Sequence, residues 1–415
     1  MTWRRPFVAL TSASLLSSAG TRLSTIAIPW LVLTQTQSPL WTGIVGMAEM
    51  LPYVLVKALS GPLIDRLQPK RIATRCDWLS AVVLALIPAL HLADSLTIPM
   101  LLPIVFVLGA LRGPADAAKQ AMVPDIAAIG AFPIERVTGT ITAVERLAST
   151  LGAATSGLLI ASLGPALSLA ANGAALAIAA AIVQFGIPAS TSARRVVAGF
   201  LAYGNELLDG WRFLHADKVL VAITIMVGLA NLLDQGFGAV FLPTWIKTSG
   251  HGPQVLGILL ATFSGCSIVG ATIAALTGER LPRLPVYIIA FLLAGFPRFY
   301  LVAATAILPM LITTFAIAGF ASGFLNPILS AVIFEHIPKH LLGRVTALTS
   351  ALIWALLPFG GLVGAAAITL LGLRGGLFAA GTLYLAISML PFTGKGFRDF
   401  KRISSDDLEP NKLSE

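Results

Sequence analysis

The chain has 415 residues, of which 56% are hydrophobic and only 11% are charged, with a net charge of +9. Soluble globular domains carry about 25% charged residues, so this chain has too few charges to cover a surface that faces water. Its two cysteines, Cys76 and Cys266, lie far apart in sequence, which excludes a disulfide framework and a cysteine metal site. The composition therefore predicts a protein whose main solvent is the lipid bilayer.

Apolar runs of about 20 residues, the length that crosses the hydrocarbon core as a helix, recur along the whole chain. They lack the period-2 alternation of strands, so we expect helices. The first run follows the basic start MTWRRPF and is too long for a signal peptide, so we expect it to be retained. The twelve expected spans are residues 7–33, 40–59, 72–93, 98–118, 134–161, 165–187, 219–246, 255–277, 286–304, 308–334, 345–371 and 375–392.

Lysine and arginine are distributed unevenly between the two sides of these spans. Of the 28, we place 21 at the termini and in the loops after even-numbered spans, and two, Lys247 and Arg374, on the other side. Because basic loops stay in the cytoplasm, both termini are predicted to be cytoplasmic in a multi-pass protein of the cell (inner) membrane. The net positive charge then follows from topology, and no basic patch with interleaved aromatic residues indicates nucleic-acid binding.

Two segments half a chain apart are similar to each other. RVTGTITAVERLASTLG begins at Arg136 and RVTALTSALIWALLPFG begins at Arg344, an offset of 208 residues. We interpret the match as a duplication that produced two six-helix halves, an architecture of transporters with a substrate site between the halves. The predicted organisation is a transmembrane bundle over 1–192, a cytoplasmic linker with an amphipathic helix over 193–217, a second bundle over 218–392 and a cytoplasmic tail over 393–415.

The loop after the second span carries the most specific motif. SGPLIDRLQPKR, residues 60–71, resembles the loop signature of the major facilitator superfamily. STIAIPWLVLTQTQSPLWTG, ERLASTLGAATSGLL and GRVTAL are similar to its branch of macrolide-efflux and siderophore-export proteins. The resemblance implies an all-α membrane fold of twelve helices in two pseudo-symmetric bundles. It also implies a loop that locks one conformation, with the motif residues Gly61, Asp65, Arg66, Lys70, Arg71 and Asp77.

The motif residues have different expected roles. Gly61 ends the second span and lets two helices turn close together. Asp65 adds nothing to the positive-inside signal, and the resemblance implies that it lies against the N-terminus of span 11. Arg66 then has Asp77 or Asp116 as its expected partner. The other basic residues of the loop serve topology.

Ionisable side chains inside the spans indicate a structural or functional role, because inserting an Asp, Lys or Arg at the centre of a membrane helix costs about 2.5–3.5 kcal/mol of free energy. Helical spacing places several of them on common faces. The candidates for binding substrate and protons are Arg22, Glu49, Tyr53, Arg112, Asp116, Glu145, Asn231, Asp234 and Gln235.

Glu49 and Asp234 are the first candidates for carrying a proton, because they lie near mid-span with no adjacent opposite charge on their own helix, and Glu145 is the next. Arg112 and Asp116, one turn apart, are expected to form a structural pair. Lys57 is expected to extend toward the membrane surface, and Arg298 to pair with helix ends or lipid headgroups.

Three functions fit these features. The favoured one is proton-driven efflux of an amphipathic or drug-like small molecule, although Ala153 follows Gly152 where proton antiporters of the family often carry proline. The alternatives are a permease that imports a small metabolite and a non-transporting receptor or scaffold. No phosphate-binding loop, nucleophile elbow or metal cluster indicates an enzyme, a cofactor or a metal. The expected partners are a small-molecule substrate, protons and the bilayer, and we expect a functional monomer.

Overall fold

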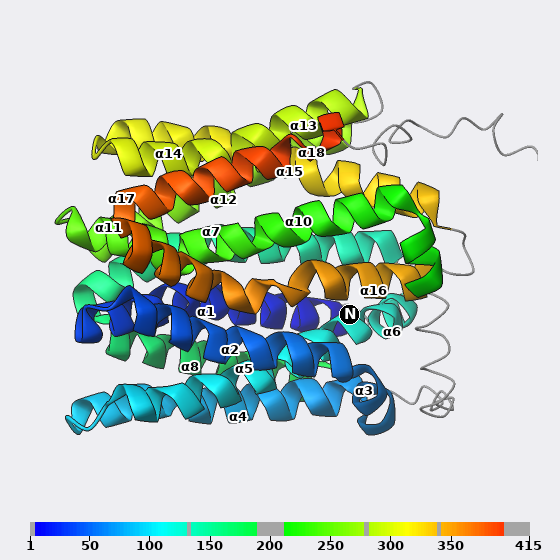
Figure 1. Cartoon of the computed structure of the whole chain (residues 1–415). Helices are drawn as coiled ribbons and strands as arrows, with labels where there is room; N and C mark the ends of the chain where they lie inside the picture. The colour runs from blue at the N-terminus through cyan, green and yellow to red at the C-terminus, as the bar shows by residue number, and fades with distance from the viewer. Residues whose placement is uncertain (1–4, 131–133, 189–210, 278–281, 338–341, 394–415) are drawn as a thin grey trace, which may run out of the picture.

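The computed structural model describes residues 5–130, 134–188, 211–277, 282–337 and 342–393 (Figure 1). The described residues form helices and contain no strand, so the all-α prediction is confirmed. The helices run side by side along one common direction, and the N-terminus lies at the same end as α3 and α6 (Figure 1). The first half contains α1 (Arg5–Thr36), α2 (Pro39–Leu59), α3 (Gly61–Leu67), α4 (Pro69–Leu92), α5 (Ile98–Ala121), α6 (Val123–Gly130), α7 (Ile134–Leu163) and α8 (Pro165–Gly186).

The second half has the same succession of long helices with more interruptions. Its first seven numbered α-helices are α10 (Lys218–Gly236), α11 (Leu242–Thr248), α12 (Pro253–Thr277), α13 (Arg283–Ala294), α14 (Phe296–Ala304), α15 (Leu308–His336) and α16 (Leu342–Ala355). The π-helical segment η2 (Phe237–Phe241) joins α10 to α11, and the 3₁₀ turn η3 (Leu357–Phe359) leads into α17 (Gly360–Ser388), which α18 (Leu390–Thr393) follows. Of the expected linker 193–217 only 211–217 is described, with a short helix over 211–216, and the expected tail lies outside the described residues apart from residue 393.

Ten described segments are long and apolar enough to cross a membrane. The last of them, Leu348–Ser388, has 41 residues, which is about 60 Å of helix and twice the hydrocarbon thickness. It reverses at Gly372, whose φ of 70° and ψ of 170° favour glycine, so this segment makes two passes. The twelfth pass is α1, whose serines and threonines lower its hydropathy. The twelve expected spans are therefore accounted for.

The two halves use glycine in equivalent places. Under the offset of 208 residues, Gly152 of α7 matches Gly360 of α17. A Cβ on Gly152 would lie 3.0 Å from the carbonyl oxygen of Ala19 in α1, and a Cβ on Gly360 would lie 2.8 Å from the Cβ of Gln235 in α10. Each glycine lets the fifth helix of its half cross closely over the first, which supports the duplication.

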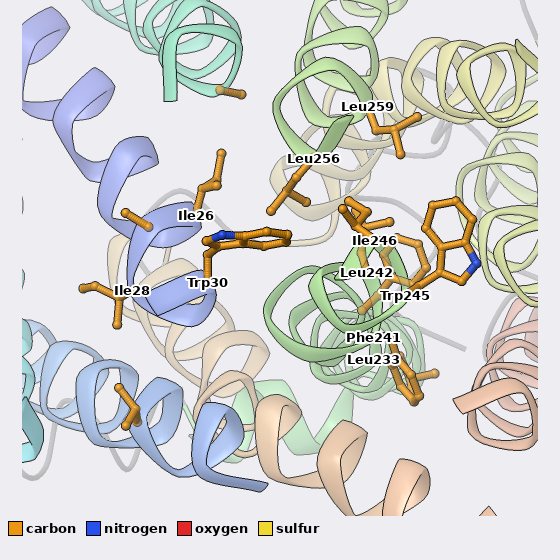
Figure 2. Packing of buried hydrophobic residues seen from close by; sticks show 14 of the residues in the cluster. Ile26, Ile28, Trp30, Leu233, Phe241, Leu242, Trp245, Ile246, Leu256 and Leu259 are labelled. Atoms are coloured by element: carbon orange, nitrogen blue, oxygen red, sulfur yellow. The ribbon is translucent and has the colours of Figure 1, made fainter. Parts of the chain in front are cut away.

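The halves contact each other at the end of the molecule far from the N-terminus. Gly43 of α2 faces Gly361 of α17, and Gly157 of α7 faces Gly257 of α12, so two pairs of helices meet backbone to backbone. Trp30, only 7% exposed, extends from α1 toward Leu256 of the other half (Figure 2). These contacts close one end of the space between the halves.

Candidate substrate and proton site

A cavity of about 340 Å³ lies between the halves, and we call it the central cavity. Its walls come from α1, α2, α5, α6 and α7, with Gln235 contributed by α10 and Trp354 by α16. The lining residues lie in those parts of the helices that are nearer the end carrying the N-terminus. The cavity is therefore separated from the opposite end by the glycine contacts and the buried Trp30.

A buried ion pair at this cavity joins two helices. The Nη1 atom of Arg112 in α5 lies 2.6 Å from Oε1 of Glu49 in α2, and both residues are buried. The expected pair of Arg112 with Asp116 is therefore wrong. The reason is the close packing of α2 on α5, where a Cβ at Gly113 would lie 2.7 Å from the carbonyl oxygen of Tyr53. This packing brings Glu49 within reach, and Arg112 satisfies a buried carboxylate that would otherwise be costly.

Asp116 instead belongs to a second group of polar side chains in the cavity. The Tyr53 hydroxyl donates to Asp116 Oδ2 at 3.1 Å, and Lys57 Nζ donates to the same hydroxyl at 3.3 Å. Lys57 Nζ also lies 5.0 Å from the ring centre of Trp354, a residue of the other half. The expectation that Lys57 extends to the membrane surface is therefore wrong, because the aromatic rings and the hydroxyl hold its amine in the cavity.

Asp77 of the loop motif pairs with Lys119, one of the basic residues that follow the fourth expected span. Lys119 Nζ of α5 lies 2.8 Å from Asp77 Oδ2, and it also donates to Ser17 Oγ of α1 at 2.8 Å. Lys119 lies one turn after Asp116 and two turns after Arg112, so extending that polar stripe would have found it. Lys119 therefore connects α5 to α1 and α4 beside the central cavity.

The structure describes the side chains of only some of the remaining motif residues. The side chains of Asp65 and Arg66 lie outside the described residues, so their proposed roles stay predictions, although Asp77 already has a lysine partner. Gly61 begins α3, and a Cβ there would meet nothing within 4 Å. The expected close helix approach at this glycine is therefore wrong. Lys70 is partly exposed and Arg71 exposed, which fits a basic loop.

The polar stripe expected on the seventh span divides among three environments. Asp234 Oδ1 accepts from Arg298 Nη2 at 2.7 Å, and the Arg298 guanidinium lies 4.8 Å from the ring centre of Phe263. The expectation that Arg298 pairs with helix ends or headgroups is therefore wrong. A carboxylate and an aromatic face hold its guanidinium inside the bundle. Gln235 lines the central cavity, whereas Asn231 lines a separate cavity of the second half.

Two charged side chains of the central cavity remain available to a ligand. Arg22 of α1 is exposed to the cavity, and Glu145 of α7 is half-buried in its wall. Neither makes a hydrogen bond or ion pair with another side chain in the described part of the chain. A cation and a carboxylate in one amphipathic cavity can bind charged or hydrogen-bonding groups of a solute.

The chain matches the Major Facilitator Superfamily over residues 10–252 and 224–399. It belongs to the major facilitator superfamily. Among relatives of this superfamily, the protein named Multidrug efflux pump Tap of Mycobacterium tuberculosis is 29% identical over 367 residues, which cover 86% of this chain and 85% of that protein. Macrolide efflux protein A of Streptococcus pyogenes is 21% identical over 400 residues, covering 94% and 95% of the two chains.

Solved structures of the superfamily share the fold at low sequence identity. The nucleoside transporter NupG superposes with a TM-score of 0.74 at 13% identity, covering 95% of this chain and 99% of that one. A D-xylose-proton symporter superposes with a TM-score of 0.72 at 15% identity, covering 95% and 98%. The family match and the sequence relatives, together with the apolar helices, make the protein a multi-pass membrane transporter and not an enzyme.

Proposed function

We propose that this transporter exports amphipathic, drug-like small molecules and is driven by protons that move in the opposite direction. The observation that carries the proposal is the central cavity, which lies between the halves, is shut off at one end and combines aromatic faces with the available charges of Arg22 and Glu145. The two relatives named as multidrug and macrolide efflux proteins support this substrate class. With both termini in the cytoplasm, as the basic residues predict, this cavity faces the cytoplasm and takes its substrate from there.

The residues of the cavity divide into two proposed roles. Arg22, Gln235 and the face of Tyr53 contact the substrate. Glu145 carries the proton, because its carboxylate borders the cavity without a cationic partner and can exchange a proton with cavity water. Binding of a substrate beside Glu145 then favours the release of that proton.

The ion pairs Glu49–Arg112 and Asp234–Arg298 have a related role in the proposal. Each joins two helices inside one half. A proton on either carboxylate would weaken its pair and free an arginine, so these carboxylates are further candidate proton carriers. The loop motif around Asp65 is proposed to stabilise one of the two arrangements of the halves, and the unit that transports is proposed to be a single chain.

Everted membrane vesicles test the export and the coupling together. Respiration acidifies their interior, which a pH-sensitive dye reports. We expect added erythromycin to make protons leave the wild-type vesicles while the drug accumulates inside. Accumulation without any change in the internal pH would contradict proton coupling, and a failure of uphill accumulation for every drug tried would contradict export.

The glutamate variant separates coupling from binding. Glu145→Gln keeps the shape and hydrogen bonding of the side chain, so we expect substrate binding to remain and the proton release and uphill accumulation to be lost. Asp94→Asn is the matched control, since it neutralises an exposed carboxylate between α4 and α5 and should pump as wild type does. Normal pumping by Glu145→Gln would contradict Glu145 as the proton carrier and leave Glu49 and Asp234 as the candidates.

A further inference from the structure

A second cavity of about 390 Å³ lies inside the second half, between α10, α15 and α16, and we call it the neutral cavity. Its size is within the range of about 300–1,000 Å³ that is typical of small-molecule sites. Every described residue that lines it is uncharged. Six of them carry hydroxyl or amide groups: Asn231, Asn326, Ser330, Thr346, Thr349 and Ser350.

Two of these hydroxyls are buried without a hydrogen-bond partner. They are the Oγ1 atoms of Thr346 and Thr349, and Thr349 is only 1% exposed. Threonines in membrane helices usually donate to the carbonyl one turn earlier, as Thr224 does to Leu220 and Thr369 does to Ala365 in this chain. A buried hydroxyl without a partner is costly. Both threonines line the cavity, so a ligand bound there would satisfy them.

The chemistry of the neutral cavity selects the kind of group that would bind there. Hydroxyl and amide side chains both donate and accept, and the hydroxyls of a solute do the same. A charged group would find no opposite charge among the described lining residues, and its desolvation would be expensive. Asn231 donates to the carbonyl of Ile353 at 3.3 Å, which holds its amide in place at the wall.

The neutral cavity and the central cavity share one side chain. The indole of Trp354 lines both cavities, and Lys57 lies against the ring on the side of the central cavity. A solute that extends from one cavity to the other therefore passes an aromatic face, which is a favourable surface for the apolar side of a sugar ring or a macrocycle.

We propose that the neutral cavity is a second substrate subsite, which binds an uncharged, hydroxyl-bearing part of the exported molecule, such as a sugar ring. This subsite rests on the proposed export function and specifies its substrate class. The charged part of the same molecule occupies the central cavity, near Arg22 and Glu145. Molecules with both parts should then bind more tightly than ions without hydrogen-bonding groups.

Two probes separate the subsites in equilibrium binding to the purified full-length protein in lipid nanodiscs. Erythromycin carries an amine, hydroxyls and sugar rings, whereas tetraphenylphosphonium is a cation with no hydrogen-bonding group. We expect the double variant Thr346→Val and Thr349→Val to raise the Kd for erythromycin about fivefold to tenfold and to leave the Kd for tetraphenylphosphonium unchanged. Valine keeps the shape of threonine and removes an unpaired polar atom, so the variant should fold at least as well.

Thr244→Val is the matched control, because Thr244 has a buried, unpartnered hydroxyl in α11, outside the neutral cavity. It should bind both probes as wild type does. Equal erythromycin affinity in wild type and the double variant would overturn the subsite, as would wild-type protein that binds no erythromycin. Uphill accumulation of tetraphenylphosphonium in everted vesicles would still support the export function in either case, so the two proposals can fail separately.

Discussion

Gly43→Ala should shift the equilibrium between the conformations of this transporter. A Cβ at position 43 would lie 2.6 Å from the carbonyl oxygen of Gly361 and 3.2 Å from the Cβ of Ala365, both in α17. Contacts below about 3 Å force α2 and α17 apart, and overpacking of this kind costs about 1–3 kcal/mol. This cost applies only when the two helices are in contact. The ratio of closed to open forms at this end should therefore fall about 5- to 150-fold.

Gly46→Ala supplies the control for this prediction. Gly46 lies on the same helix, one turn later, and a Cβ there would meet nothing within 4 Å. Both substitutions change helix propensity equally, so their difference isolates the contact with α17. The measurement is the distance between spin labels at Gln37 and Thr248, on opposite halves, in protein whose native cysteines are replaced by serine. Identical distance distributions for Gly43→Ala and Gly46→Ala would refute the reasoning.

Three further predictions concern single charged residues. Asp65→Asn should leave membrane abundance near wild type and strongly reduce transport, and normal flux would reduce the loop to a topology signal. Glu49→Gln should lower the stability of the detergent-solubilised protein by about 3–5 kcal/mol, because Arg112 would be left buried and unpaired, and adding Arg112→Met should restore part of it. Thermal unfolding measures both, and no recovery in the double variant would contradict this account. Arg22→Gln should weaken binding of anionic solutes more than of tetraphenylphosphonium, and equal losses for both probes would assign Arg22 a structural role.

The positions of the membrane spans could be predicted from the sequence, because the length and apolarity of a span are local properties of the chain. The outer limits of the expected spans agree with the described helices to within a few residues, although the seventh, ninth, eleventh and twelfth spans are each divided among two or more helical elements. The turn at Gly372 falls between the eleventh and twelfth expected spans. The serines and threonines of α1 lower its hydropathy, but the apolar residues among them still form a run long enough to be recognised.

Charge pairing was less predictable, because it depends on which helices touch. Arg112 and Asp116 have ideal spacing for a pair on one helix, yet the arginine binds Glu49 of α2. The glycines that admit α2 against α5 are visible in the sequence, but nothing in it identifies the helix that fills the space. The same limit applies to Lys119 and Asp77, whose contact requires the mutual placement of α4 and α5.

The neutral cavity was missed for a different reason. Charged groups inside a span are conspicuous because they are costly, whereas threonine is common in membrane helices without any special role. Only the structure reveals that Thr346 and Thr349 lack the usual carbonyl partner. Their spacing of three residues places them on one helical face, which was the available signal.

The position of Trp354 between the two cavities has a consequence for how such a transporter changes its substrate range over evolutionary time. One side chain, 39% exposed, forms part of the wall of cavities of about 340 and 390 Å³. Replacing it with a small residue would connect the two volumes without altering the buried ion pairs or the glycine contacts that the halves need in order to move. A single substitution at this position would thus extend the proposed export function to bulkier molecules and leave the other residues of the transporter unchanged.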